Sequence, residues 1–254
     1  MNAIKRIAAI DIGNSNIKAV VDNKKITCDY SSDWIDKISS FLDSNLIPNS
    51  IVGISSVQPE RYNQLIKKIK YRVITADELL KNQKIIDFSE IEGIGNDRLL
   101  GLIGASINFS SPLITVDCGT AITINLLNEK NKCEGGVIFA GIETQLEALS
   151  SKAALLKRVD LYLEDDIIGK NTDSAIRNGI IKGVAGSILY IVENIIKQYG
   201  YENNINLILT GGTSKLIQPL LEKTNPKFHF DENLVLNGLI HLINHSFGTD
   251  FAKY

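Results

Sequence analysis

Two short segments of the chain carry residue types that bind phosphate and a cation. The first reads Asp11-Ile12-Gly13-Asn14 and the second reads Asp117-Cys118-Gly119-Thr120. Each segment follows an apolar run and precedes an alternating one, a pattern that predicts a strand, a tight turn and a second strand. The glycine lets the backbone approach a phosphate or adopt a positive φ, and N–H groups in turns bind anions. The aspartate supplies the carboxylate oxygen that a hard cation prefers.

A single copy of this pattern indicates only an ordinary turn. Two copies with matching flanks favour a function, because two hairpins that face each other can hold a nucleoside triphosphate from both sides. Phosphoryl transfer depends mainly on positioning and on neutralisation of charge, and these segments are suited to both. The repeat also indicates a duplicated domain.

A third segment, Gly93-Ile94-Gly95-Asn96-Asp97-Arg98, precedes a predicted helix. Asn96 or Asp97 can serve simply as the helix N-cap. The functional alternative makes Asp97 a general base that accepts a proton from an attacking alcohol, and Arg98 a clamp for an anion. The segment does not match a dinucleotide-binding fingerprint, because the third glycine is missing and no strand is predicted directly before it.

Two further glycine segments, Gly135-Gly136 with Gly141 and Thr210-Gly211-Gly212, permit either close packing or close approach of a nucleotide or substrate. Thr172 is predicted to cap a long helix over 172–199, which does not exclude a contact with substrate. Gly179, Gly183 and Gly186 form a small-residue stripe along that helix. Each glycine weakens an exposed helix by roughly 1 kcal/mol, so the stripe predicts close packing against another element.

The order of predicted elements repeats. The chain is predicted to form two α/β domains, 1–111 and 112–254, each with the order βββαβα. The first half has strands within 4–29, at 51–54 and at 71–74, with helices at 33–46 and 59–68. The second half has strands at 113–116, 122–127, 136–139 and 207–210, with helices at 141–153, at 172–199, from 214 and at 233–244.

The composition is that of an ordinary globular protein. The chain has 254 residues, 44% of them hydrophobic, and a net charge of −2 without a basic patch, which argues against nucleic acid or a membrane surface as partner. No stretch is predicted to be long and apolar enough to span a bilayer. The three cysteines lack metal-type spacing and indicate reduced thiols, and His241 with His245 indicates a helix face rather than a metal site. We expect a cytoplasmic protein.

Taken in order, these segments resemble the type III pantothenate kinases, a family in the actin-like (ribonuclease H-like) superfamily of acetate and sugar kinases. The resemblance covers nearly the whole chain. It rests on several short motifs: Asp11 to Asn16, Ser55 to Pro59, Gly95 to Arg98, Asp117 to Thr123, Glu134 to Gly136 with Gly141, Gly169 to Thr172, and Thr210 to Gly212. The implied fold is two duplicated actin-like domains with a nucleotide cleft between them.

The resemblance implies ATP-dependent phosphorylation of pantothenate to 4'-phosphopantothenate, the first step of coenzyme A biosynthesis. It implies Asp97 as proton acceptor, Asp117 as ligand of a monovalent cation (potassium or ammonium), and Asp11 as magnesium ligand, directly or through water. The family is dimeric, and the glycine-striped helix is a candidate for the contact. The implied ATP-binding residues are Asp11, Ile12, Gly13, Asn14, Ser15, Asn16, Ile17, Lys18 and Thr120, and the implied substrate-binding residues are Phe88, Gly95, Asn96, Asp97, Arg98 and Thr172.

Three positions depart from the family pattern. Asn125 stands where the second phosphate motif usually ends in aspartate, Ala140 replaces a proline, and Asn96 replaces a small apolar residue. The loss of a carboxylate at Asn125 weakens or alters the expected cation site. Two alternatives stay open: a kinase of this fold that acts on another small alcohol or acid, and a nucleotide-binding regulatory protein without turnover.

Overall fold

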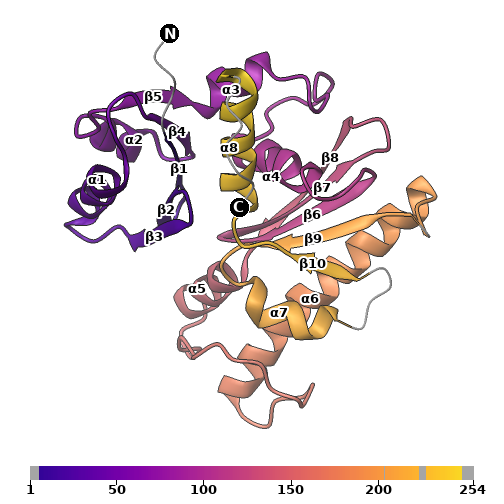
Figure 1. The fold of residues 1–254 in the computed structure, drawn as a ribbon. Helices are drawn as coiled ribbons and strands as arrows, with labels where there is room; N and C mark the ends of the chain where they lie inside the picture. The colour runs from indigo at the N-terminus through magenta and orange to yellow at the C-terminus, as the bar shows by residue number, and fades with distance from the viewer. Residues whose placement is uncertain (1–5, 203, 223–226, 248–254) are drawn as a thin grey trace. The chain divides into compact units, whose positions relative to one another are not determined.

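The computed structural model describes residues 6–202, 204–222 and 227–247, and it divides into two compact units (Figure 1). The first unit comprises Met1–Asn108 and Asn233–Tyr254, and the second comprises Phe109–Glu232. Each unit contains one five-stranded sheet.

The sheet of the first unit has the strand order β3-β2-β1-β4-β5. The first three strands pair antiparallel, and β4 and β5 extend the sheet in parallel from β1. The elements of this unit are β1 (Ile7–Ile12), β2 (Asn16–Val21), β3 (Lys24–Asp29), α1 (Trp34–Asn45), β4 (Ile51–Ser56), α2 (Pro59–Ile66), β5 (Arg72–Thr75), α3 (Ala76–Asn82), α4 (Asn96–Ser106) and α8 (Leu234–Phe247).

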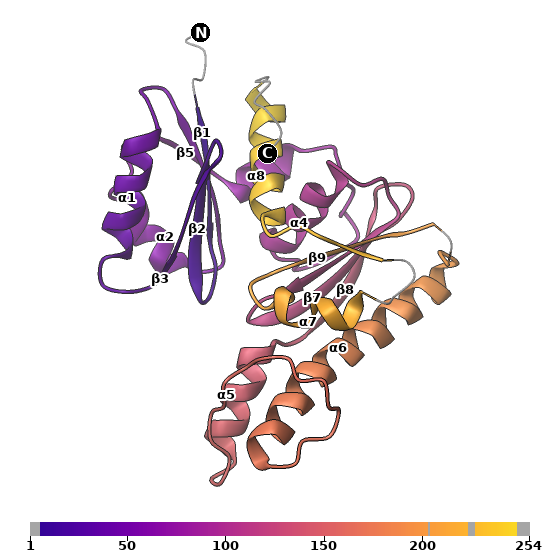
Figure 2. The same cartoon turned by 60° about the horizontal axis from the view of Figure 1, so that its bottom comes forward.

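Alternation along the strands sends side chains to two helical layers. Ile10 and Ile12 of β1 are fully buried in a core that includes Ile38 and Leu42 of α1. The opposite face of the sheet lies against α8, where a Cβ at Gly53 would come within 2.4 Å of Ile243. Figure 2 shows α1 and α2 on one side of this sheet and α8 on the other. The sheet is therefore covered on both faces, which suits its parallel half.

Helices α4 and α8 meet at two glycines. A Cβ at Gly104 would lie 2.1 Å from the carbonyl oxygen of Leu234, and one at Gly238 would lie 2.1 Å from that of Leu100. Real side chains do not come so close to backbone oxygens. The reciprocal glycines thus set the distance between the two helices.

The sheet of the second unit repeats the first, with the order β10-β9-β6-β7-β8. Strands β6, β7 and β8 pair antiparallel, and β9 and β10 extend the sheet in parallel from β6. The elements are β6 (Leu113–Cys118), β7 (Ala121–Leu127), β8 (Cys133–Ala140), α5 (Ile142–Lys152), α6 (Thr172–Tyr199), β9 (Asn206–Thr210), α7 (Ser214–Leu221) and β10 (Phe228–Phe230).

Helix α6 is long and apolar enough to cross a membrane by length and composition, contrary to the expectation from the sequence. One of its faces packs in the core of the second unit, with Ile180, Val184 and Ile188 almost fully buried beside residues of α5 and α7. Its apolar character therefore has a structural explanation. The glycine stripe lies on the exposed side, and a Cβ at any of the three glycines would meet nothing within 4 Å.

The structure confirms the predicted duplicated α/β fold, since each strand of one sheet has its counterpart at the same place in the other. Helix α3 and strand β10 were not predicted. The division also differs from the predicted domains 1–111 and 112–254, because α8 belongs to the first unit. The physical reason is the glycine contact with α4, which sequence periodicity does not reveal.

The α4–α8 contact makes a prediction about stability. Gly104→Ala should destabilise the protein by about 1–3 kcal/mol, because its methyl group would push the backbones of the two helices apart. Urea unfolding at equilibrium measures the change. The control is Gly101→Ala in the same helix, where the new Cβ would be 4.0 Å from its nearest neighbour, a side-chain carbon of Leu234. A loss of stability in the control equal to that in Gly104→Ala would contradict this account.

Candidate functional site

The first hairpin turn follows β1, the central strand of its sheet. The N–H of Gly13 donates to the carbonyl oxygen of Asn16 at 3.0 Å, and a Cβ at Gly13 would lie 3.1 Å from that oxygen. Asp11 is half-buried at the end of β1, directly across from Lys18 on β2. The turn thus presents a carboxylate, an ammonium group and backbone amides on a short stretch of chain.

The predicted ATP-binding residues of this hairpin are placed in two ways. Asn14 and Ser15 are exposed at the tip of the turn. Ile12 and Ile17 pair with each other and are fully buried in the core. These two isoleucines can therefore meet a ligand only through their backbone.

Side chains that sequence reasoning missed brace this turn. The Gln58 amide donates to the Asn14 side-chain oxygen, Arg61 donates to the Asn14 carbonyl, and the Tyr30 hydroxyl lies against the turn carbonyls. All three residues are distant in sequence from the turn. Gln58 belongs to the motif Ser55 to Pro59 of the family resemblance, whereas no motif marks Tyr30 or Arg61. Pro59, the first residue of α2, marks in the sequence where the helix that carries Arg61 begins, and Gln58 is the N-cap of that helix.

The segment Gly93 to Arg98, which we call the acceptor segment, leads into the first turn of α4. Gly95 is the N-cap, without a side-chain cap, so neither Asn96 nor Asp97 serves as N-cap. The Asp97 carboxylate accepts from the N–H of Arg98 at 2.9 Å, and a Cβ at Gly95 would lie 2.5 Å from that carboxylate. Gly95 therefore leaves the space that Asp97 occupies. Asp97 thus lies in the first turn of α4, at the positive end of the helix dipole.

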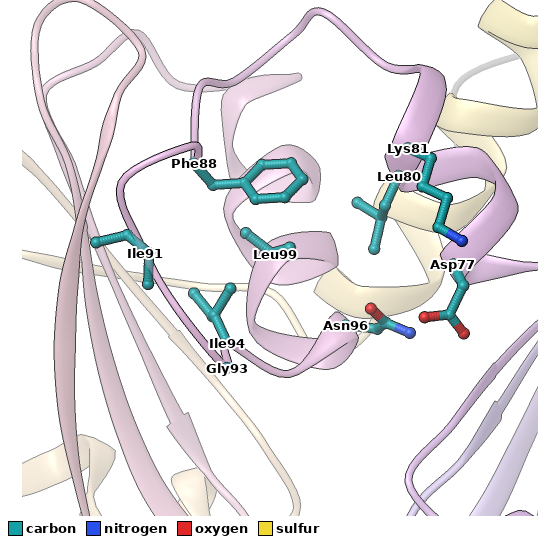
Figure 3. Close-up of a pocket in the computed structure, with 9 residues that line it drawn as sticks. All are labelled: Asp77, Leu80, Lys81, Phe88, Ile91, Gly93, Ile94, Asn96 and Leu99. Atoms are coloured by element: carbon teal, nitrogen blue, oxygen red, sulfur yellow. The ribbon is translucent and has the colours of Figure 1, made fainter.

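A pocket of about 230 Å³ lies beside this helix start (Figure 3). One side carries the apolar residues Phe88, Ile91 and Ile94, and the other side carries polar groups. The pocket brings together Phe88 and Asn96, two of the predicted substrate residues. Its full lining is Asp77, Leu80, Lys81, Phe88, Ile91, Gly93, Ile94, Asn96 and Leu99. Such a cavity suits a small molecule that has both apolar and polar parts.

Two polar residues of the pocket, Asp77 and Lys81, come from the unpredicted helix α3. That helix begins with a capping box, in which the N–H of Glu78 donates to the Thr75 hydroxyl and the N–H of Thr75 donates to the Glu78 carboxylate. The pattern T-x-x-E is readable in the sequence as a helix start. The sequence thus contains a signal for α3, although no helix was predicted there.

The second hairpin turn, after β6, is enclosed by backbone. A Cβ at Gly141 would lie 2.1 Å from the carbonyl oxygen of Gly119. A Cβ at Gly211, whose φ is +98°, would lie 2.4 Å from both the Asp117 carboxylate and the N–H nitrogen of Cys118. Gly141 and Gly211 therefore allow the backbone of their own segments to lie directly against this turn.

Hydroxyl groups complete the enclosure. The Thr144 hydroxyl donates to the carbonyl oxygen of Thr120 at 2.6 Å, and the Thr213 hydroxyl donates to that of Cys118 at 2.9 Å. Thr120 itself is exposed. Burial raises the pKa of the Cys118 thiol far above its usual value, which makes this cysteine a neutral packing residue.

Asp117 lies in a row of oxygen-bearing side chains across the sheet. Thr123 on β7 and Thr210 on β9 are its direct neighbours on the two flanking strands, so all three share one face. Thr115 and the buried Asn125 form the next row. Carboxylate and hydroxyl oxygens are the ligands of hard cations. The amide of Asn125 adds an oxygen donor to this face but no charge.

Thr172 is the first residue of α6 and is exposed. The predicted role of Thr172 as N-cap is wrong, because Asn171 caps the helix in a capping box with Ser174. Asn171 precedes the first helical residue, and its side-chain oxygen accepts from the N–H of Ser174, the third residue of the helix, at 2.9 Å. Gly169 lies so close to the first turn that a Cβ there would be 2.2 Å from the nitrogen of Ala175.

Across the part of the chain that the structure describes, no group of three or more His, Cys, Asp or Glu side chains is arranged to hold a metal ion. The predicted residues fall into two sets. The first unit holds Asp11 to Lys18, Phe88 and the acceptor segment, and the second holds Asp117, Thr120 and Thr172.

Comparison with known proteins identifies the family. The family model of type III pantothenate kinases matches residues 7–194, more than half of the chain. The type III pantothenate kinase of Sulfurihydrogenibium sp. (strain YO3AOP1) is 32% identical over 255 residues, which cover 93% of this chain and 98% of that protein. The one from Thermosipho africanus is 37% identical over 210 residues, which cover 83% of this chain and 78% of that protein.

Solved structures agree on the fold. A Campylobacter jejuni protein described under the name Baf family transcriptional activator gives a TM-score of 0.61 at 20% identity, over 95% of this chain and all of that one. The ethanolamine utilization protein EutJ from Carboxydothermus hydrogenoformans gives 0.52 at 12% identity, over 93% and 89%. These likenesses support the actin-like fold. With the ordered motifs and the family model, they lead to one conclusion: the chain belongs to the type III pantothenate kinase family and is an enzyme of that family.

Proposed function

We propose that this protein transfers the γ-phosphate of ATP to the primary hydroxyl of pantothenate, the first step of coenzyme A biosynthesis. The observation that carries the proposal is the acceptor segment. In a chain of this family, Gly95 leaves room for the Asp97 carboxylate at the start of α4, beside a pocket that is apolar on one side and polar on the other. Pantothenate has that character, with a branched apolar centre and polar ends.

The two hairpins would hold the nucleotide. Kinases of this family use ATP with a divalent metal, which we take to be magnesium. Asp11 would supply a carboxylate for that ion, directly or through water, and Lys18, Thr120 and the turn amides would each offer a partner to phosphate oxygens. When bound, the cations neutralise charge that develops on the transferred phosphate.

Asp97 would accept the proton of the pantothenate hydroxyl as its oxygen attacks the γ-phosphorus. Asn96 and Arg98 flank Asp97 on the same helical turn and would orient the acceptor, and Phe88 would supply apolar contact without a hydroxyl. Thr172 would make a further contact with substrate. Each role rests on the family motif and on the place of the residue in its unit.

We assign the monovalent cation, potassium or ammonium, to Asp117. The support is its row of oxygen donors, in which Thr123 and Thr210 flank the carboxylate. Asn125 contributes a neutral amide where the family usually has a second carboxylate. A site with one fewer negative charge binds a cation more weakly, so we expect activation to require more salt than a site with both carboxylates.

We also propose a homodimer in the cytoplasm, where ATP is available. The support is the exposed face of α6, where Gly179, Gly183 and Gly186 leave the backbone open and Tyr190 is 69% exposed. A second copy that packs there would explain why one helix contains three glycines, although each glycine lowers the stability of an exposed helix.

The reaction itself is tested by ADP release. Turnover should depend on pantothenate and should be stimulated by potassium, compared with sodium as the only monovalent cation. Potassium stimulation would support the cation site at Asp117. A protein that binds ATP but releases no ADP in either salt would contradict the proposed reaction, and a panel of other small alcohols and acids would then follow.

Removal of the proton acceptor should separate catalysis from binding. Asp97→Asn keeps the shape of the side chain but lowers its basicity, so kcat should fall by about 10²–10⁴-fold while the affinity for ATP changes little. Steady-state kinetics and calorimetric titration of ATP measure the two quantities. Near-wild-type turnover in a folded Asp97→Asn protein would show that the assigned role is wrong.

The dimer is tested on the glycine stripe. Gly183→Glu should convert the dimer to a monomer, because it places a charge and a long side chain on the contact, and light scattering after gel filtration reports the mass. Ser40→Glu adds the same charge to an exposed position of α1 and should leave the dimer intact. A wild-type protein that is monomeric at micromolar concentration would refute the proposal.

A further inference from the structure

The first hairpin turn is held from one side by the side chains of Tyr30 and Arg61. The Tyr30 hydroxyl lies 2.6 Å from the carbonyl oxygen of Gly13 and 3.0 Å from that of Asn16, so one hydroxyl bridges both ends of the turn. Arg61 Nη1 donates to the carbonyl oxygen of Asn14 at 2.9 Å. Three carbonyl groups of a four-residue turn therefore have partners from elsewhere in the first unit.

Tyr30 and Arg61 also hold each other. The Arg61 guanidinium carbon lies 3.3 Å from the centroid of the Tyr30 ring, a stacked cation–π contact. The other neighbour of that ring is Trp34, whose ring is perpendicular to it at 5.4 Å between centroids. Trp34 is only 6% exposed and belongs to the core of this unit. The stack thus ties the turn to the core.

Gln58 restrains the side chain at the tip of the turn. Its amide nitrogen donates to the side-chain oxygen of Asn14, and its own backbone N–H donates to the Ser56 hydroxyl at 3.0 Å. Both the backbone and the side chain of Asn14 are therefore fixed.

Peptide geometry turns these contacts into an orientation. In a planar trans peptide, the C=O and the following N–H point in opposite directions. Because the carbonyls of Gly13 and Asn14 point toward Tyr30 and Arg61, the N–H groups of Asn14 and Ser15 point to the other side. Successive N–H groups that point the same way form an anion-binding concavity.

We infer that Tyr30 and Arg61, with Gln58, are positioning residues for the nucleotide, and that they aim the amides of the first turn at its phosphates. The inference rests on the proposed nucleotide-binding role of this hairpin. Arg61 adds its own positive charge below the turn, which strengthens attraction for an anion above it. These three side chains contact the turn and do not line the pocket beside α4. Their substitution should therefore weaken the binding of ATP and leave the binding of pantothenate unchanged.

The test is calorimetric titration of the protein with ATP and magnesium, without pantothenate. Tyr30→Phe keeps the stacked ring but removes the hydroxyl, and Arg61→Lys keeps the charge but removes the flat stacking surface. Each should raise the Kd for ATP by about tenfold, the cost of a lost hydrogen bond of ordinary strength. In steady-state kinetics the KM for ATP should rise while the KM for pantothenate stays constant.

A spectroscopic signal follows the stack itself. Trp34 is the single tryptophan of the chain, so its emission reports the surroundings of Tyr30 without interference. Emission should change when ATP binds to the wild-type protein, and the midpoint of that change should shift to higher ATP concentration in both variants.

The matched control is Arg72→Lys. Arg72 also faces an aromatic ring, that of Phe247 at 4.9 Å, but on the edge strand β5 of the same unit. This variant should bind ATP as the wild type does. Thermal unfolding checks that all variants fold. If Tyr30→Phe does not fold, the ATP titration of Arg61→Lys alone tests the inference.

Wild-type affinity for ATP in both folded variants would overturn the inference. An equal loss in Arg72→Lys would overturn it as well, because the effect would then not be specific to the turn. A wild-type protein that binds ATP but never phosphorylates pantothenate would contradict the proposed function alone, since the binding titration still decides the inference. A wild-type protein that binds no ATP would overturn both.

Discussion

Close approach of backbone to backbone at the end of β6 is the constraint on which the second unit depends. The turn after this strand lies between two other segments, and at each of them a single methyl group would collide with its atoms. Gly211 carries an additional restriction, because its positive φ is one that side chains other than glycine rarely adopt. Neither glycine needs a ligand to explain it. Their effect is to let the segments that contain Gly141 and Gly211 lie directly against the turn that follows Asp117.

The two hairpins arrive at similar turns by different means. The turn after β1 is braced by long side chains, whose aromatic and guanidinium groups stack between it and the core. The turn after β6 is braced by short hydroxyl side chains and by glycine backbone. Duplication explains the shared strand order of the two sheets. It does not dictate what surrounds each turn, because packing partners come from segments that differ in length and composition between the two halves.

Much of the fold could be predicted from the sequence, for physical reasons that are easy to name. Apolar alternation identified the strands around both hairpins, and helical spacing identified α1 and α6. The placement of α8 could not be predicted, because it depends on close contacts at Gly53 in the sheet and between α4 and α8 at Gly104 and Gly238. A glycine in the sequence does not say what approaches it. Helix α3 was predictable in principle from its capping box.

The candidate site likewise contains residues that could be predicted from the sequence and residues that could not. The carboxylates Asp11, Asp97 and Asp117 could be proposed from the sequence as site residues, because their motifs are local. Tyr30 and Arg61 were not found, since only the folded chain brings them to the turn. Asn171 caps α6, whereas the sequence predicted Thr172. The prediction was wrong by one residue because both side chains are good N-caps.

The return of α8 to the first unit has a consequence for synthesis on the ribosome. The second unit is continuous in sequence, from Phe109 to Glu232, and has all its strands once that stretch has emerged. The first unit begins earlier but cannot close the contact between α4 and α8 until the last helix is made. The part of the chain that is translated first is therefore completed last, and until then the surface of α4 that α8 will cover has no partner from its own unit.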